Sequence, residues 1–219
     1  CSPNYLHDAH IRFGLRHGAD VICEKPLVLN PWNVDALAEI EAETERKIYT
    51  ILQLRLHPNV IALREKVLKA DKNKRFDIDL QYITSRGNWY NFSWKGNISK
   101  SGGIATNIGI HFFDMLLWVF GDVLENQVEY HRANKAAGFL RLERADVNWR
   151  LSIDENDLPD ESDKKTFRSI LIDGERFEFS EGFTDLHTLC YQNILSGKGF
   201  GLAESKKAIE LVHQIRNSA

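Results

Sequence analysis

Three polar side chains interrupt an otherwise apolar stretch near the middle of the chain, at residues 107–120. Asn107, His111 and Asp114 follow one another at spacings of four and three residues, which place them on one face of a helix. Burial of a histidine and a carboxylate lowers stability unless the groups are paired or used. The pattern therefore indicates either the wall of an active site or a core histidine that hydrogen-bonds to Asp114. The helix by itself leaves both interpretations open.

A lysine stands where a ligand would bind. The apolar run 19–23 is typical of a short buried parallel strand, and Glu24, Lys25 and Pro26 follow it directly. In doubly wound sheets, ligands bind beyond the carboxyl ends of the strands, and residues 1–7 occupy the equivalent place after a presumed earlier strand. Lys25 is therefore a candidate to donate hydrogen bonds and to stabilise developing negative charge. The alternative is a solvated loop lysine.

The elements around Lys25 alternate between helix and strand. We expect helices at 5–17 and at about 31–47, the second with Asn30 as its N-cap and Pro31 at its first position, and buried strands at 19–23 and 48–54. This alternation is the back half of a doubly wound sheet. Residues 1–55 are therefore predicted to form an α/β domain, the C-terminal part of a Rossmann-like doubly wound sheet.

The remaining residues, 56–219, follow another rhythm. Helices are expected at about 58–70, 106–120, 184–195 and 203–217, and alternating strands at 76–83, 127–132, 138–142, 145–153, 168–172 and 176–179. Asp173-Gly174 between the last two strands is a strong hairpin signal. The pattern predicts an α+β domain with a large open, mainly antiparallel sheet that has one polar and one apolar face.

Composition excludes several classes of protein. The 219 residues carry a formal net charge of −3 without a basic stripe, which argues against nucleic acid as the main partner. No apolar run approaches the ~20 residues of a membrane span, and no signal peptide opens the chain. Three cysteines without metal-type spacing favour buried thiols in a reducing, cytoplasmic setting, and we predict no metal site. Because the chain starts with Cys rather than Met, we expect that an N-terminal part is missing.

Three motifs occur in a fixed order: Ser-Pro-Asn-x-x-His at 2–7, Glu-Lys-Pro at 24–26 and Gly-Gly-x-x-x-Asn-x-Gly-x-His-x-x-Asp at 102–114. Together they resemble the Gfo/Idh/MocA family of NAD(P)-dependent oxidoreductases, and the resemblance covers the whole chain. It implies that Lys25 and His111 are the catalytic pair beside the nicotinamide, with NAD preferred to NADP. The contacts to the cofactor that it implies come from Ser2, Pro3, Asn4, His7, Glu24 and Lys25.

The chemistry of such a family agrees with these residue types. Hydride transfer from a secondary alcohol needs a base for the hydroxyl proton, and a histidine of near-neutral pKa suits that task. Asp114, one turn along the helix, could orient the ring of His111. The family usually has Asp where this chain has Asn107, which could bind a sugar hydroxyl but could not act as a base.

Further segments, 82–90, 93–96, 105–109 and 180–187, resemble one branch of the family. This branch contains the WlbA/WbpB-type UDP-N-acetyl-2-amino-2-deoxyglucuronate 3-dehydrogenases of bacterial surface polysaccharide synthesis. The resemblance implies a nucleotide-sugar substrate that is oxidised at its 3-hydroxyl, and some members regenerate NAD with 2-oxoglutarate. The implied substrate contacts are Lys25, Arg86, Asn88, Trp89, Asn107, His111, Thr184 and His187.

Several of these contacts have a plainer alternative. The planar guanidinium of Arg86 matches a carboxylate or a phosphate, but it could equally form a surface ion pair. Trp89 could stack on the uracil or the sugar, or simply pack. Thr184 and His187 stand at an expected helix start, where backbone donors favour anions, and Thr184 could instead be the N-cap.

The Gly-x-Gly-x-x-Gly fingerprint and its ribose-binding acid do not occur in the chain. We therefore expect the isolated chain to be inactive and to bind NAD weakly or not at all. Two alternative functions remain: a dehydrogenase for another sugar or polyol, and a non-catalytic sugar-binding or assembly module. Because members of the family commonly pair through the open sheet, a homo-oligomer, either a dimer or a tetramer, is implied.

Overall fold

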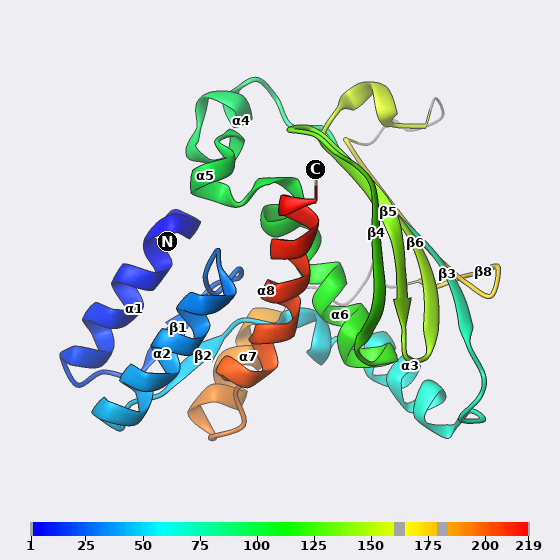
Figure 1. Cartoon of the computed structure of the whole chain (residues 1–219). Coiled ribbons are helices and arrows are strands. Elements are labelled where there is room, and N and C mark those ends of the chain that lie inside the picture. Colours follow the sequence, from blue (N-terminus) through cyan, green and yellow to red (C-terminus); the bar gives the residue numbers. More distant parts are fainter. Residues whose placement is uncertain (1, 160–164, 179–183, 219) are drawn as a thin grey trace.

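The structure is a computed structural model that describes residues 2–159, 165–178 and 184–218. A small and a large β-sheet lie on either side of the C-terminal helix α8 (Leu202–Asn217) (Figure 1). Cys1, Phe179 of the last expected strand and residues 180–183 of the motif at 180–187 lie outside the described residues.

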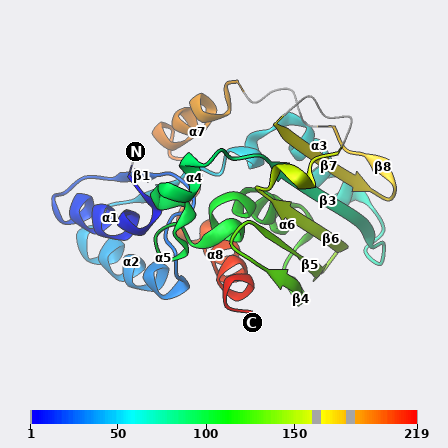
Figure 2. The same cartoon turned by 90° about the horizontal axis from the view of Figure 1, so that it is seen from above.

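The N-terminal unit is an α/β layer. It comprises η1 (Asn4–Leu6), α1 (His7–Arg16), β1 (Val21–Cys23), α2 (Pro31–Thr44) and β2 (Ile48–Thr50). β1 and β2 are parallel, with Val21 opposite Ile48, and α1 and α2 lie next to each other (Figure 2). The predicted α/β class is confirmed. The second strand is shorter than expected, because the chain turns after Thr50 into the 3-10 helix η2 (Gln53–Leu56).

The second unit is built on a six-stranded mixed sheet in the order β4-β5-β6-β3-β7-β8. Its strands are β3 (Phe76–Thr84), β4 (Val123–His131), β5 (Lys135–Leu142), β6 (Ala145–Ser152), β7 (Thr166–Ile172) and β8 (Glu175–Arg176). The β3–β6 pair is parallel and the other pairs are antiparallel. Asp173 and Gly174 form the expected β7–β8 turn, with φ angles of 52° and 79°. The predicted large, mainly antiparallel sheet is therefore confirmed.

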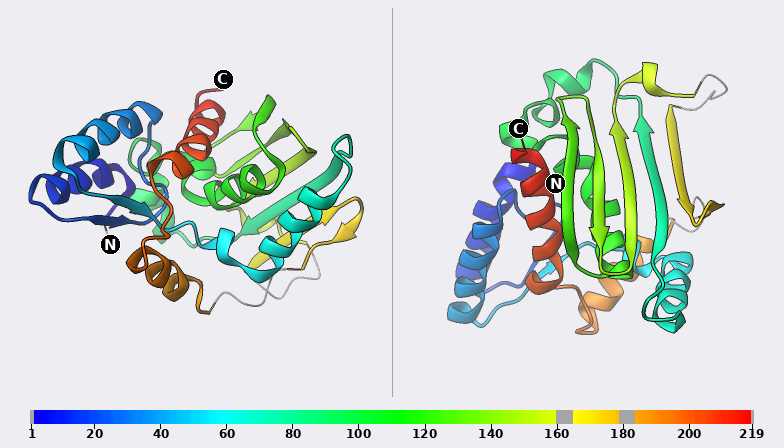
Figure 3. Two further views of the ribbon diagram at one scale, coloured as in Figure 1. Left: turned by 90° about the horizontal axis from the view of Figure 1, so that it is seen from below. Right: turned by 45° about the vertical axis from the view of Figure 1, so that its right-hand side comes forward.

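Helices cover one face of this sheet. α6 (Ile110–Phe120) packs on the inner face, with α3 (Pro58–Lys69) and α8 against it (Figure 3). The ring of Phe113 meets that of Trp149 on β6 edge to face, with centroids 5.2 Å apart. Short helices complete the unit: α4 (Trp89–Phe92), η3 (Trp94–Gly96), α5 (Ile98–Ser101) and η5 (Glu155–Asp157). The longer helix α7 (Leu186–Leu195) packs against η2 and Ile51 instead.

The C-terminal helix joins the two units. On its N-terminal half, the hydroxyl of Ser205 donates to the hydroxyl of Thr50 at 2.9 Å. On its last turn, Arg216 donates to the side-chain oxygen of Asn30 at 2.6 Å. Phe200, just before α8, forms an isolated bridge with Thr50. The division of the chain at residues 55 and 56 therefore describes the sheets, but the core of the first unit is completed by the end of the chain.

The segment Ile98–Phe120 is long and apolar enough to cross a membrane by length and composition, contrary to the expectation that no run approaches that length. In the structure 83% of its most apolar window is buried inside the protein. Core helices share these properties, and this one lies between the sheet and α8.

Candidate active site

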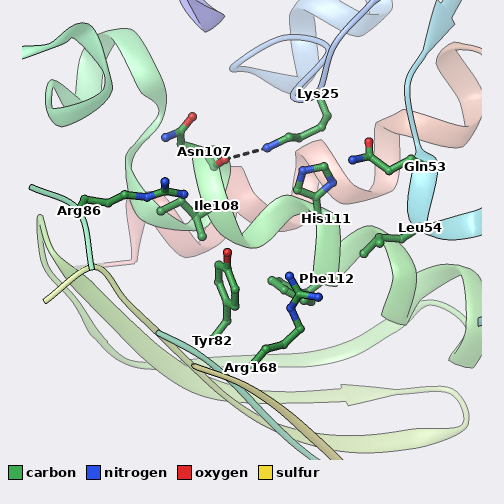
Figure 4. Close-up of a pocket in the computed structure, with 10 residues that line it drawn as sticks. All are labelled: Lys25, Gln53, Leu54, Tyr82, Arg86, Asn107, Ile108, His111, Phe112 and Arg168. Carbon is green, nitrogen blue, oxygen red and sulfur yellow. Dashed lines mark hydrogen bonds between the residues drawn. The ribbon is translucent and has the colours of Figure 1, made fainter. Parts of the chain in front are cut away.

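A cavity of about 250 Å³ opens where the carboxyl ends of β1 and β2 face the inner side of the large sheet (Figure 4). The segments that follow both strands of the small sheet contribute to its wall, as expected of a doubly wound sheet. The residues that line it are Lys25, Gln53, Leu54, Tyr82, Arg86, Asn107, Ile108, His111, Phe112 and Arg168.

Lys25 reaches the cavity from the loop after β1. Its ammonium group donates to the backbone carbonyl of Asn107 at 3.0 Å. Removal from water lowers the pKa of Lys25 to about 8, an effect that Glu24 opposes and that Lys95 and Arg86 reinforce. The side chain of Lys25 is therefore fixed by a hydrogen bond and has a lowered pKa. The alternative interpretation, a solvated loop lysine, is wrong.

The start of the polar helix is a π-helix. Gly102 and Gly103 have φ angles of 82° and 77°, a left-handed conformation that favours glycine. They turn the chain into the π-helical segment η4 (Ala105–Gly109), which continues into α6. Such wide turns often occur at functional sites, and here the carbonyl of Asn107 lies in the wide turn and meets Lys25 (Figure 4).

His111 is half-buried in the wall of the cavity. Burial lowers its pKa well below the usual value, and the positive charges of Lys25, His187 and Arg168 lower it further. A near-neutral pKa was expected, and the structure corrects this: without a bound anion the imidazole is neutral at neutral pH. A neutral imidazole can accept a proton.

Asp114 has a different partner from the one expected. Arg55 binds both of its carboxylate oxygens, from Nε at 3.0 Å and from Nη2 at 2.7 Å. The pair is buried, and Arg55 also donates to the backbone carbonyl of Glu204 at 2.8 Å. The expected role of Asp114 as the direct orienter of the His111 ring is therefore replaced by an ion pair that ties α6 to η2 and α8.

The amide of Asn107 is held by neighbours on both sides. Its oxygen accepts from the side chain of Asn4 at 3.2 Å, and its nitrogen donates to the hydroxyl of Tyr90 at 3.0 Å. Asn4 also donates to the backbone carbonyl of Ser101 at 3.0 Å. Asn107 and Asp114, the two ends of the polar stripe, thus have different partners.

Six wall residues were absent from the expected site: Gln53, Leu54, Tyr82, Ile108, Phe112 and Arg168. Gln53 could have been found from its sequence, because it follows the second parallel strand as Lys25 follows the first. The side-chain oxygen of Gln53 is buried without a hydrogen-bond partner among the described residues. Arg168 carried no signal, because only the register that places it opposite Tyr82 brings it to the cavity.

Several expected contacts lie outside this cavity. His7 links the segment before α1 to the loop after β1. Its Nδ1 lies 2.8 Å from the carbonyl oxygen of Pro26, and its Nε2 lies 3.2 Å from that of Ser2. Glu24 lies 3.2 Å from Nε2 of His187, near the surface. The other expected contacts that do not line the cavity are Ser2, Pro3, Asn4, Asn88, Trp89 and Thr184. The N-cap of α7 is Asp185, so the alternative role of Thr184 as N-cap is wrong.

The charges of the cavity have one sign. The described residues that line it include three cations, Lys25, Arg86 and Arg168, and no carboxylate. Cations that converge in a confined space repel one another, so an anion is favoured there. The arrangement can therefore bind an anionic ligand while it presents a lysine and a neutral histidine to a reacting group.

Solved structures and curated proteins resemble this chain. It is 49% and 48% identical to the WlbA (WbpB) dehydrogenase from Thermus thermophilus in crystal structures with NAD and alpha-ketoglutarate and with NAD and UDP-GlcNAcA. The TM-scores are 0.95 and 0.94, and the matches cover 100% of this chain and 71% of that one. Inositol 2-dehydrogenase from Rhizobium meliloti is 29% identical over 56% of this chain and 36% of its own length. D-glucoside 3-dehydrogenase from Escherichia coli is 28% identical over 62% of this chain and 38% of its own length. The chain thus spans between a third and two fifths of these two curated relatives.

Two family models match the chain in order. Residues 1–51 match the NAD-binding Rossmann fold of the oxidoreductase family, and residues 74–146 match its C-terminal alpha/beta domain. The first match contains Lys25, and the second contains His111 and the strands β3, β4 and β5. Taken with a relative of 49% identity that the chain matches from end to end, these matches show that the chain belongs to the Gfo/Idh/MocA oxidoreductase family.

Proposed function

We propose that the chain forms the substrate-binding part, and the edge that faces the nicotinamide, of an NAD-dependent dehydrogenase. Its substrate is a UDP-N-acetylhexosaminuronic acid, which it oxidises at the 3-hydroxyl. The observation that carries the proposal is the meeting of Lys25 and His111 in one cavity, where the charged groups of the described lining residues are all cationic. An inositol or a glucoside carries no charge, so the cations favour a nucleotide uronic acid over such substrates.

The residues at the rim fit the nicotinamide end of NAD. The buried oxygen of Gln53 has no hydrogen-bond partner among the described residues, and an acceptor of this kind suits a carboxamide N–H. Gln53 and Lys25 follow neighbouring parallel strands, where doubly wound sheets place their ligands. When bound, NAD would accept the hydride. Contacts from Ser2, Pro3, Asn4, His7 and Glu24 remain part of this proposal.

The protons are handled by His111 and Lys25. The neutral imidazole of His111 accepts the proton of the 3-hydroxyl while the hydride leaves the same carbon. Lys25, with a pKa of about 8, is mostly protonated at neutral pH and donates a hydrogen bond to the developing carbonyl oxygen. A bound anion offsets the charges of Lys25 and Arg168, which raises the pKa of His111 toward its usual value.

Two further parts of the proposal concern the partner and the setting. A dicarboxylate such as 2-oxoglutarate carries the charge that this cavity favours, so it is proposed as the oxidant that regenerates NAD. Cys23 and Cys190 are free and buried, which supports a reducing cytoplasmic location. There the product would serve as the precursor of a 3-amino sugar in surface polysaccharide synthesis.

The test uses the intact protein that contains this chain. With UDP-N-acetylglucosaminuronate and NAD, formation of NADH is expected to be abolished in Lys25→Met and in His111→Asn. Lys69→Met and His10→Asn replace exposed residues of the same types and should keep the normal rate. Near-normal turnover in both cavity variants would falsify the assignment.

A second measurement concerns the chain by itself. Because it lacks the glycine-rich pyrophosphate loop, it should bind NAD weakly or not at all in a calorimetric titration. Micromolar binding would contradict this expectation.

A further inference from the structure

The cationic residues enter the cavity from different places (Figure 4). Lys25 comes from the nucleotide-binding edge, Arg86 from the loop after β3, and Arg168 from β7 on the inner face of the large sheet. Arg86 is exposed at the mouth, whereas Arg168 is half-buried in the wall. The two arginines therefore occupy different depths.

Arg168 is held on aromatic rings. It stands opposite Tyr82 in the β3–β7 register, and its guanidinium lies 5.6 Å from the centroid of the Tyr82 ring. The Tyr82 ring in turn lies 4.9 Å from that of Phe112, the residue after His111. A cation over an aromatic face is stabilised without losing its charge. The ring of Tyr82 thus contributes to the position of the guanidinium relative to His111.

The shape of the proposed substrate matches this layout. In a pyranose ring, carbon 3 lies opposite the ring oxygen, and carbons 1 and 5 flank that oxygen. A UDP-uronic acid carries its diphosphate on carbon 1 and its carboxylate on carbon 5. When carbon 3 faces Lys25 and His111, the two anionic groups leave the opposite side of the ring in different directions, which requires two separate cations.

The depths of the arginines decide which group each one binds. The cavity, at about 250 Å³, is smaller than the roughly 300–1,000 Å³ of pockets that enclose drug-sized ligands. The nucleotide must therefore extend past the mouth, where Arg86 lies, while the carboxylate on the ring stays inside with Arg168.

We propose that Arg168 is the specificity residue that binds the carboxylate of the sugar in a bidentate manner, and that Arg86 binds the diphosphate. This inference rests on the proposed function. It assigns discrimination between a uronic acid and the corresponding neutral sugar, which has a hydroxymethyl group on carbon 5, to one side chain on β7.

The experiment measures calorimetric dissociation constants of the intact protein with NAD for UDP-N-acetylglucosaminuronate, UDP-N-acetylglucosamine and UDP. For Arg168→Gln, we expect affinity for the uronate to fall roughly 10–100-fold, the range for hydrogen bonds to charged groups, and the other two to change less than about threefold. Arg168→Lys should lose less, because it keeps the charge without the planar fork. Arg86→Gln should weaken all three ligands.

Arg150→Gln is the matched control, because Arg150 lies on the outer face of the same sheet, beside Asp157, and should leave all three affinities unchanged. An equal loss for the uronate and the neutral sugar in Arg168→Gln, or no loss, overturns the assignment. If Arg168→Gln fails to fold, a normal preference for the uronate in Arg168→Lys, which keeps a cation but no fork, overturns bidentate binding. A wild-type protein that binds neither UDP-sugar refutes the proposed function itself. If the wild type binds the uronate and the Arg168 variants bind it with the same affinity, only the role of Arg168 is refuted.

Discussion

The buried pair of Arg55 and Asp114 predicts a large, asymmetric response to substitution. The side chains are 8% and 4% exposed, and both oxygens of the carboxylate are bound. Asp114→Leu would leave the guanidinium of Arg55 buried without a counter-charge, which lowers the free energy of unfolding by about 3–5 kcal/mol. For a protein of this size, that corresponds to a fall in Tm of about 6–20 °C.

The double variant Arg55→Met/Asp114→Leu should recover most of this loss. Burial raises the pKa of Asp114 above its usual value, although Arg55 opposes the rise. The folded state therefore disfavours the ionised carboxylate, so its contribution to stability is greatest below the usual pKa and declines as pH rises through the raised one. Replacement of both charges by packed apolar groups is consequently expected to be neutral or stabilising.

Thermal and denaturant unfolding of the wild type, both single variants and the double variant form a double-mutant cycle. Because Asp114 lies one turn after His111, kcat should fall in Asp114→Leu and return in the double variant if the loss arises from misplacement of α6. A loss of less than about 1 kcal/mol in Asp114→Leu, the scale of an exposed ion pair, would refute the reasoning.

Three further predictions concern pH, packing and assembly. The rate should fall as pH rises through about 8, the pKa of Lys25. Because Lys95 lowers that pKa, Lys95→Met should move the midpoint of this fall to higher pH; an unchanged midpoint in the pH–rate profile would contradict the electrostatic account. Gly109→Ala should destabilise the protein by about 1–3 kcal/mol, measured by denaturant unfolding, because its Cβ would lie 2.6 Å from Cδ1 of the buried Leu151; unchanged stability would show that the wall can shift. The protein should form dimers or tetramers through the outer face of the six-stranded sheet, and Phe139→Glu on that face should shift the mass seen by light scattering; a monomeric wild type at high concentration would remove this expectation.

The convergence of Lys25 and His111 could be anticipated from the sequence. The run before Lys25 indicated a parallel strand, and the carboxyl ends of such strands share one edge. The spacing of Asn107, His111 and Asp114 indicated one helix face. Both inferences depend on hydrophobic periodicity within a short segment, which can be recognised directly in a sequence.

The partners of these residues could not be anticipated. Arg55 and Asp114 are 59 positions apart, and Tyr82 and Arg168 meet through strand register. Such pairings follow from the three-dimensional arrangement of the elements, which periodicity does not encode. The π-helical turn at Asn107 could not be anticipated either, because an α-helix and a π-helix differ by a single residue in the span of their hydrogen bonds, which a hydrophobic pattern does not resolve.

The link between Ser205 and Thr50 spans 155 positions of the chain. Proteins are synthesised from the N-terminus. The side of the β1–β2 sheet that packs against α8 is therefore covered only after α8 has been made. Contacts between such distant positions slow folding, since a long loop must close before the contact forms. Until α8 has been synthesised, the nascent chain therefore exposes the surface of β2 that faces this helix, and chaperones can act at that surface.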